Sequence, residues 1–305
     1  MDYALIAEQI LNGLQSGVTL FLTAAGLTLV FGIVGLINLT HGTLVMLGAF
    51  TGATVSAISG LFWLGLFSAV LAALSIGLLL EVLIFRKLYR RDHLDQVLAT
   101  FALILFFNEL TRIAFGRQPF QIEPPAALSG SVHLFGDLNY PVYRLVVIAV
   151  GILVALLLWA LIAKSRLGML IRAGSTHRDV VSCLGVNVSA LFLAIFALSA
   201  SLAGLAGAIV APQQAVEVGM GEQIIILAFV VIVIGGVGSV KGALLASVLV
   251  GITDALGRSV VPLALASMFE PTMVASISGA FAAMSAYIVL VAVLIWRPQG
   301  LFLRT

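Results

Sequence analysis

A short polar stretch in an apolar part of the chain carries residue types that could bind a ligand. It reads INLTHGTLVMLGAF over Ile37–Phe50, and its polar or small members of interest are Asn38, Thr40, His41 and Gly42. An amide, a hydroxyl and a neutral imidazole at the mouth of an apolar helix can cap that helix or hydrogen-bond across a bundle. The same groups can instead line a path for a polar solute, and the pattern leaves both roles open. A lone histidine without cysteine or carboxylate neighbours is a poor metal ligand, so no metal site is predicted.

A second stretch, IGGVGSVKGALLAS over Ile234–Ser247, is rich in glycine. Its candidate functional members are Gly235, Gly236, Gly238 and Ser239. It is not a phosphate-binding loop, because valine precedes Lys241 and neither serine nor threonine follows it. A helix broken here would present backbone amides and carbonyls to a buried cavity, where they could receive a carboxylate or an ammonium group. The alternative is a tight turn that lets two helices pack closely.

Charged residues within the apolar segments are few, and most have a partner at helical spacing. Glu109 and Arg112 are three residues apart, and Asp254 and Arg258 are four apart, so each pair can share one helix face. Intramembrane charges are functional suspects by default. Both pairs are predicted near the outer ends of their segments, however, which favours anchoring. No Ser/His/Asp set or carboxylate pair suited to catalysis is identifiable, so the chain is not predicted to be an enzyme.

The composition predicts an integral membrane protein that forms a single domain over residues 1–305. The chain is 62% hydrophobic and 9% charged, whereas soluble domains carry roughly 25% charged residues. Not one Asp, Glu, Lys or Arg occurs from Gln9 through Leu80. The net charge of +2 argues against binding to nucleic acid, and the single cysteine, Cys183, excludes an internal disulfide.

The apolar segments predict an all-α polytopic fold with about eight or nine transmembrane segments. They lie near Ile10–Leu36, Gly42–Gly60, Leu64–Phe85, Leu94–Phe115, Val142–Ala163, Ser189–Ala211, Gln223–Ile234, Ala243–Leu256 and Met273–Trp296. The seventh and eighth are short and separated by glycines, so one of them could be broken or re-entrant. Prolines, including Pro262, are expected outside the helices or at their rims. The positive-inside rule places Arg86–Arg91 and Lys164–Arg178 in the cytoplasm, with the N-terminus outside.

A basic polar island, Ser165–Val188, interrupts the apolar pattern. Thr176 and Asp179 resemble a capping box, and Gly185 stands where a left-handed C-cap is expected, which together predict a helix of about nine residues. Such a helix is shorter than the roughly 12–15 residues that are stable alone in water, so it must pack on something. It could fill a groove on a cytoplasmic partner or lie on lipid headgroups.

The combination of these features resembles a known family. The early N-L-x-H-G motif, the island, the late G-G-x-G-S motif and the ending RPQGLF (Arg297–Phe302) occur in the order and spacing of the permease subunits of branched-chain amino-acid ABC importers, most closely the Liv-type H subunit. The resemblance covers essentially the whole chain. It implies an inner-membrane subunit without cofactor that pairs with a second related permease subunit, two cytoplasmic ATPase subunits and a periplasmic substrate-binding protein.

The resemblance also implies roles for particular residues. The island, about residues 165–188, would be the coupling segment that docks on the ATPase. Its matching positions are Arg172, Ala173, Asp179, Leu184 and Gly185. The chain departs from relatives at Ser175–Arg178, where acidic or amide residues are common. The two stretches described first are then candidates to line half of the translocation path.

Two other functional classes fit the sequence less well. A secondary transporter driven by an ion gradient would need a central carboxylate or histidine relay, and the available charges are predicted to be peripheral and paired. An intramembrane enzyme would need a nucleophile and base. The substrate stays open among branched-chain and other amino acids, urea, amides and small aromatic acids.

Overall fold

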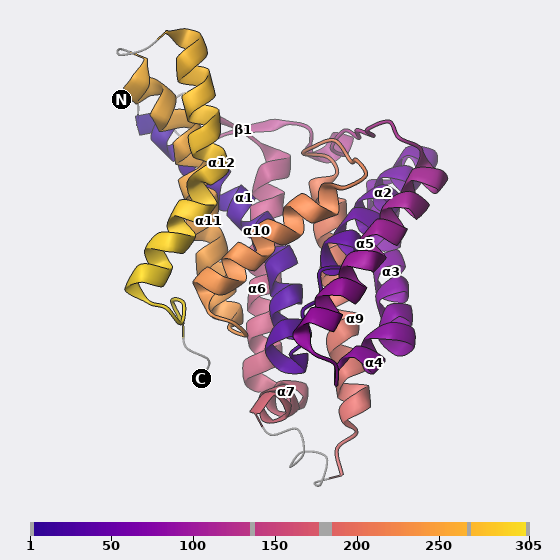
Figure 1. Cartoon of the computed structure of the whole chain (residues 1–305). Helices are drawn as coiled ribbons and strands as arrows, with labels where there is room; N and C mark the ends of the chain where they lie inside the picture. The colour runs from indigo at the N-terminus through magenta and orange to yellow at the C-terminus, as the bar shows by residue number, and fades with distance from the viewer. Residues whose placement is uncertain (1–2, 135–137, 177–184, 267–269, 303–305) are drawn as a thin grey trace.

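The structure is a computed structural model that describes residues 3–134, 138–176, 185–266 and 270–302, most of them in a helical bundle (Figure 1). Within these ranges, eight helices are long and apolar enough to cross a membrane. They are α1 (Tyr3–Leu29, continued by the π-helical turn Val30–Val34), α2 (His41–Ser59), α3 (Phe62–Leu80, continued by the π-helical turn Glu81–Phe85 and α4, Arg86–Leu88), α5 (His93–Phe115), α6 (Val142–Lys164), α9 (Val188–Val210), α11 (Val240–Leu265) and α12 (Pro271–Trp296). The predicted all-α polytopic class is confirmed.

A further apolar helix, α10 (Met220–Gly235), corresponds to the short seventh segment. Its 16 residues make it about 24 Å long, less than the roughly 30 Å of a hydrocarbon core. It runs obliquely across the bundle from the side of α2 toward α11 (Figure 1).

Helix α1 lies at the centre of the bundle, in contact with α6, α9, α10 and α11. Its closest neighbour is α11, which it crosses through small residues. A Cβ at Gly13 would lie 2.6 Å from the Cα of Ile252, and a Cβ at Gly17 would lie 2.7 Å from the Cα of Val248. These two glycines therefore serve packing within the chain.

Helix α11 is longer than predicted. The sequence prediction ended it at Leu256 and placed Pro262 at a rim, but the helix continues to Leu265 with Pro262 inside it. That prediction was wrong because one proline removes a single ladder hydrogen bond, which a packed membrane helix can tolerate. As a result, Asp254 and Arg258 lie well within α11 instead of at its end.

The two ends of the bundle differ. The end that holds the N-terminus carries a hairpin of two short antiparallel strands, β1 (Ser131–His133) and β2 (Asn139–Pro141) (Figure 1). The opposite end carries α4, with its basic residues, and α7 (Arg166–Thr176), a helix that was not predicted. Ser165 begins α7, since its Oγ accepts a hydrogen bond from the Gly168 N–H at 3.0 Å. Most of the predicted helix between Thr176 and Gly185 lies outside the described residues.

Candidate functional site

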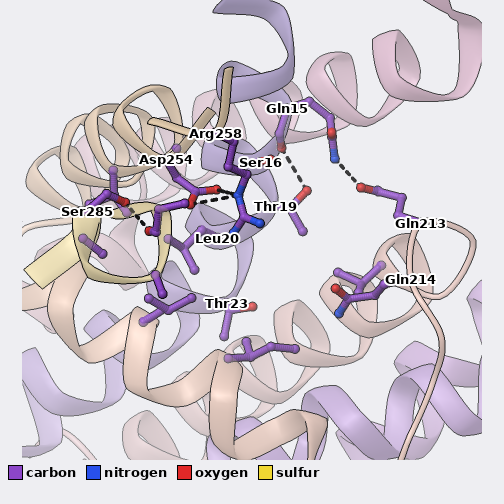
Figure 2. A pocket seen from close by; sticks show the side chains of 18 residues that line it. Gln15, Ser16, Thr19, Leu20, Thr23, Gln213, Gln214, Asp254, Arg258 and Ser285 are labelled. Atoms are coloured by element: carbon purple, nitrogen blue, oxygen red, sulfur yellow. Dashed lines mark hydrogen bonds and ion pairs between the residues drawn. The ribbon is translucent and has the colours of Figure 1, made fainter. Parts of the chain in front are cut away.

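A cavity of about 320 Å³ lies between α1, α10, α11, α12 and the loop that follows α9 (Figure 2). Its polar lining is unusual for the interior of a membrane bundle: Gln15, Ser16, Thr19, Thr23, Gln213, Gln214, Asp254, Arg258 and Ser285. Aliphatic side chains complete the wall: Leu20, Val210, Ile224, Leu227 and Val250, with alanines of α12. Such a mixture suits a small ligand with both polar and apolar parts.

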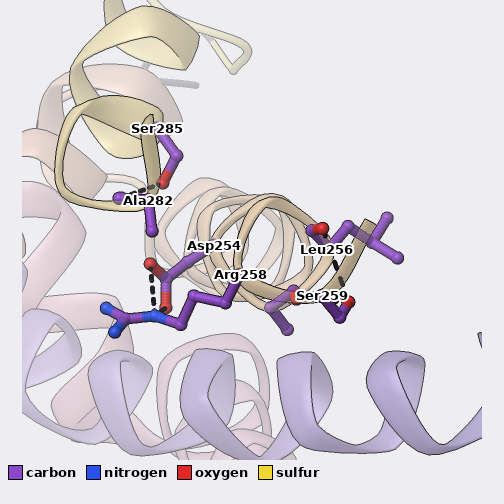
Figure 3. Close-up of polar contacts among 7 residues, drawn as sticks. Asp254, Leu256, Arg258, Ser259, Ala282 and Ser285 are labelled. Carbon is purple, nitrogen blue, oxygen red and sulfur yellow. Dashed lines mark hydrogen bonds and ion pairs between the residues drawn. The ribbon is translucent and has the colours of Figure 1, made fainter. Parts of the chain in front are cut away.

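An ion pair forms the charged side of the cavity. The Arg258 Nε donates to both carboxylate oxygens of Asp254, at 3.1 and 3.0 Å. Figure 3 shows the two side chains projecting together from one side of α11, with Ser259 on another side. The Arg258 side chain is 66% exposed and that of Asp254 29% exposed. The pair is therefore accessible although it belongs to a membrane-spanning helix.

Two glutamines close another part of the cavity. The Gln15 Nε2 of α1 donates to the Gln213 Oε1 of the loop after α9 (Figure 2). The Gln213 Nε2 in turn donates to the Ile209 carbonyl at 3.0 Å. The contact joins two residues that are 198 positions apart in the sequence, so this wall of the cavity forms only when the bundle folds.

His41 lies directly behind the cavity wall. Its buried ring makes a 3.0 Å contact from Nε2 to the carbonyl oxygen of Thr23, whose residue lines the cavity. The Nδ1 lies 3.3 Å from the Ser199 Oγ, and that hydroxyl donates to the Gly26 carbonyl at 2.9 Å. His41 thus links α1, α2 and α9, and its role in a path stays a prediction.

The neighbours of His41 are buried as well. The Thr40 Oγ1 donates to the Thr100 carbonyl of α5 at 3.1 Å, and Thr40 makes no side-chain cap. Asn38 is 1% exposed, and its Oδ1 has no hydrogen-bond partner among the described residues. A Cβ on Gly42 would overlap the carbonyl oxygen of Gly221, so this glycine lets α2 meet α10. None of these three residues lines the cavity.

The glycine-rich turn lies elsewhere, between α10 and α11. Gly236 and Gly238 have φ angles of 97° and 85°, and the Ser239 Oγ caps α11 by accepting from the Gly242 N–H at 3.0 Å. A Cβ on Gly235 would lie 2.7 Å from the Ala243 nitrogen. Tight packing and helix capping therefore explain why glycines and a serine occur at this turn. That Gly235, Gly236, Gly238 and Ser239 line a path stays a prediction.

The C-terminal motif completes this turn. The Leu301 N–H donates to the Ile234 carbonyl at 2.8 Å, and the Phe302 N–H donates to the Gly235 carbonyl at 3.1 Å. The last carbonyls of a helix have no partner within it, so the tail supplies donors that α10 lacks. The glycine-rich motif after α10 and the C-terminal RPQGLF motif therefore form one structural unit.

The predicted coupling residues are only partly described. Arg172 and Ala173 are exposed on α7, whose other face packs Ile171 inward and brings Gly174 against Leu191 of α9. Gly185 has a φ of 81°, the left-handed conformation expected of it. Asp179 and Leu184 lie outside the described residues.

Comparison with known proteins gives one consistent result. The family described as branched-chain amino acid transport system / permease component matches residues 9–273. The chain belongs to this permease family. The high-affinity branched-chain amino acid transport system permease protein BraD of Pseudomonas aeruginosa is 30% identical over 83% of this chain and 86% of BraD. LivH of Escherichia coli is 26% identical over 83% of this chain and 86% of LivH. LivM of Escherichia coli, another permease protein of such a system, is 29% identical over 92% of this chain and 67% of LivM. No solved structure matches the chain.

The chain is therefore a multi-pass membrane protein and a permease subunit of a transporter. The cavity was not predicted from the sequence, although its charged pair was identified there. Gln15 and Gln213 are polar residues in or beside apolar segments, and that contrast was the available signal. Nothing local to either residue indicates that they meet.

Proposed function

We propose that this permease is the transmembrane subunit of an ATP-driven importer for branched-chain or related amino acids. It would form half of the translocation path in a bacterial inner membrane and have no catalytic residues of its own. A second related permease subunit would form the other half. Two cytoplasmic ATPase subunits would hydrolyse ATP, and a periplasmic binding protein would deliver the substrate.

The observation that carries the proposal is the exposed ion pair inside a membrane-spanning helix. Helix α11 has 26 residues and is about 39 Å long, so its interior crosses the roughly 30 Å hydrocarbon core. A guanidinium that is two-thirds exposed on such a helix is costly if it faces the hydrocarbon core, and charged groups of transmembrane segments usually face protein or a water-filled cavity. A second permease subunit against the cavity would provide that environment.

The basic end of the bundle supports ATPase coupling. Helix α7 holds Arg172 and Ala173 on its exposed face, and the segment with Asp179, Leu184 and Gly185 follows it in the sequence. We propose that these five residues contact an ATPase subunit. The buried Ile171 and Gly174 would connect the contact to α9, and so to the bundle.

The test is uptake by the intact complex. The chain is purified with the proteins encoded beside its gene and reconstituted into proteoliposomes, and uptake of radiolabelled leucine, isoleucine and valine is measured. Uptake that needs both ATP inside and loaded binding protein outside is expected. Ligand identification on the purified binding protein would then name the substrate.

A secondary transporter is the second candidate, and Asp254 is the observation in its favour. The structure places this carboxylate inside α11, where a proton-coupled carrier would need one. Uptake that continues without ATP and collapses with the proton gradient would favour that candidate and overturn the first.

A further inference from the structure

We propose that Asp254, Arg258 and the aliphatic wall of the cavity form a transient binding site for the zwitterionic form of an α-amino acid within the permease. The site rests on the proposed function and makes it more specific. It assigns the charged pair to the α-ammonium and α-carboxylate groups, and the wall to an aliphatic side chain. Urea, amides and aromatic acids lack this combination of groups.

The hydrogen-bonding capacity of the pair fits such a ligand. Arg258 engages Asp254 through Nε alone, although a guanidinium carries five N–H donors in a fork that matches a carboxylate. The carboxylate of Asp254 has about four acceptor positions and receives one N–H group in this contact. A ligand carboxylate can therefore meet the terminal Nη groups while a ligand ammonium meets Asp254.

The charge balance also favours a zwitterion. The pair is neutral as a unit, and a zwitterion adds one charge of each sign, so the guanidinium and the carboxylate each gain an additional partner of opposite charge. A ligand with only a carboxylate, or with neither charged group, would leave one or both members of the pair without an added partner.

Pro262 contributes an independent feature beside the pair. A proline inside a helix cannot donate to the carbonyl four residues earlier, and that carbonyl belongs to Arg258. The carbonyl oxygen thus lacks its usual helical donor. In the proposed site this oxygen would supply a further acceptor for the ammonium group.

The remaining wall has the size and polarity for one aliphatic side chain. Leu20, Ile224, Leu227 and Val250 face the cavity, together with alanines of α12. The volume of about 320 Å³ is at the small end for ligand sites. It is therefore large enough for a single amino acid.

Another ion pair among the described residues, between Glu109 and Arg112, shows the contrast with an anchor. Glu109 and Arg112 lie 2.5 Å apart within the last turns of α5, which ends at Phe115. They do not line the cavity. This pair has the same chemistry at a helix end, so it is the matched control.

The experiment uses the reconstituted complex with saturating loaded binding protein. Asp254→Asn and Arg258→Gln are expected to lower amino-acid uptake by about tenfold or more, as for truncation of one partner of a charged contact. In these two variants, ATPase stimulation by the binding protein should stay within about twofold of its value in the unaltered complex. In the control variants Glu109→Gln and Arg112→Gln, both uptake and ATPase stimulation should stay within about twofold of that complex.

The exchange variant Asp254→Arg with Arg258→Asp separates binding from anchoring. It keeps an ion pair on the same helix face but exchanges the positions of the carboxylate and the guanidinium. Uptake should therefore stay low, while the complex should assemble normally. Recovery of uptake, or near-normal uptake by both single variants, would overturn the site and leave the importer function standing. Absence of ATP-dependent uptake by the unaltered complex would overturn the proposed function itself, and the site with it.

Discussion

His41 connects three helices through one buried side chain. Its ring contacts the Thr23 carbonyl of α1 and the Ser199 hydroxyl of α9, while its backbone starts α2. Buried polar groups are stabilising when they are paired and costly when they are not. The imidazole therefore acts on the bundle as a cross-link between helices, one layer behind the cavity.

Replacing His41 by alanine tests whether this residue packs the bundle or contacts substrate. We expect His41→Ala to destabilise the permease by about 2–4 kcal/mol, since it removes two polar contacts and leaves a void. The thermal unfolding temperature and the amount of assembled complex should fall. Uptake per assembled complex should be near normal.

Ser276→Ala is the control, because this hydroxyl is exposed and, among the described residues, bonds only the Thr272 carbonyl of its own helix. An unchanged unfolding temperature in His41→Ala, combined with lost uptake, would instead assign the ring to the path. Asn38→Ala can be compared in the same assay, since its Oδ1 is buried without a partner among the described residues.

At the scale of elements, the crossing of α1 and α11 forms one wall of the cavity. Gly13 and Gly17 on α1 meet Gly251 and its neighbours on α11 at backbone contact. In lipid, where burial of apolar surface gives little driving force, such close approach supplies van der Waals packing. The position of Asp254 relative to Gln15 depends on this contact, because the two residues lie on the two crossing helices.

The crossing predicts different effects of substituting Gly251 of α11, which lies in the contact, and Gly279 of α12, which lies outside it. A Cβ on Gly251 would overlap the Gly13 carbonyl oxygen, whereas a Cβ on Gly279 of α12 would meet nothing within 4 Å. We expect Gly251→Ala to destabilise the bundle by about 1–3 kcal/mol through overpacking. Gly279→Ala should be neutral or stabilising by up to about 1 kcal/mol through helix propensity. Thermal unfolding of the purified complex measures both, and equal shifts would contradict the crossing.

The glycine turn and the C-terminal tail show the same dependence between elements. Tail N–H groups pair with carbonyls at the end of α10, so neither segment is complete without the other. Gly236 has almost no space beside it, since a Cβ there would overlap the Phe302 carbonyl oxygen. The spacing of the two motifs in the chain gives no indication of this pairing.

At the scale of the whole molecule, the cavity and the basic end lie in different parts of the bundle. The helices α1 and α9 connect them, since α1 lines the cavity and packs on α9, and α9 packs on α7. A subunit that transmits ATPase motion to a substrate path needs such a continuous packed connection. The arrangement agrees with the proposed coupling role of α7.

Substitutions at the exposed face of α7 should reduce coupling and leave the fold intact. We expect Ala173→Glu to lower the binding-protein stimulation of the ATPase by roughly fivefold or more, because it adds a charge to the proposed contact. Gly185→Val should act similarly, since valine is strained at a φ of 81° by about 1–3 kcal/mol. Binding of ligand to the binding protein should not change.

Ala127→Glu makes the same change on an exposed residue at the other end of the bundle. It should leave co-purification of the ATPase subunits unaltered. Full stimulation and uptake in both Ala173→Glu and Gly185→Val would contradict the coupling role.

The sequence alone predicted the membrane class, the basic end and most span boundaries, but it placed the start of α1 too late and the end of α11 too early. These properties depend on local quantities, namely the length of an apolar segment, the cost of charges in lipid and the bias of Lys and Arg. The N-L-x-H-G, G-G-x-G-S and RPQGLF motifs are also local features, and they indicate the family without knowledge of how the helices pack.

Only the tertiary structure decided which residues share a site. Gln15, Gln213 and Asp254 belong to separate segments, and their meeting depends on how closely glycines let α1 and α11 approach. The continuation of α11 past Pro262 likewise depended on its neighbours, and Asp254 and Arg258 line the cavity only because α11 packs beside α1 and α12. Apolar patterning sets which segments enter the membrane, whereas side-chain packing between distant segments sets what they enclose.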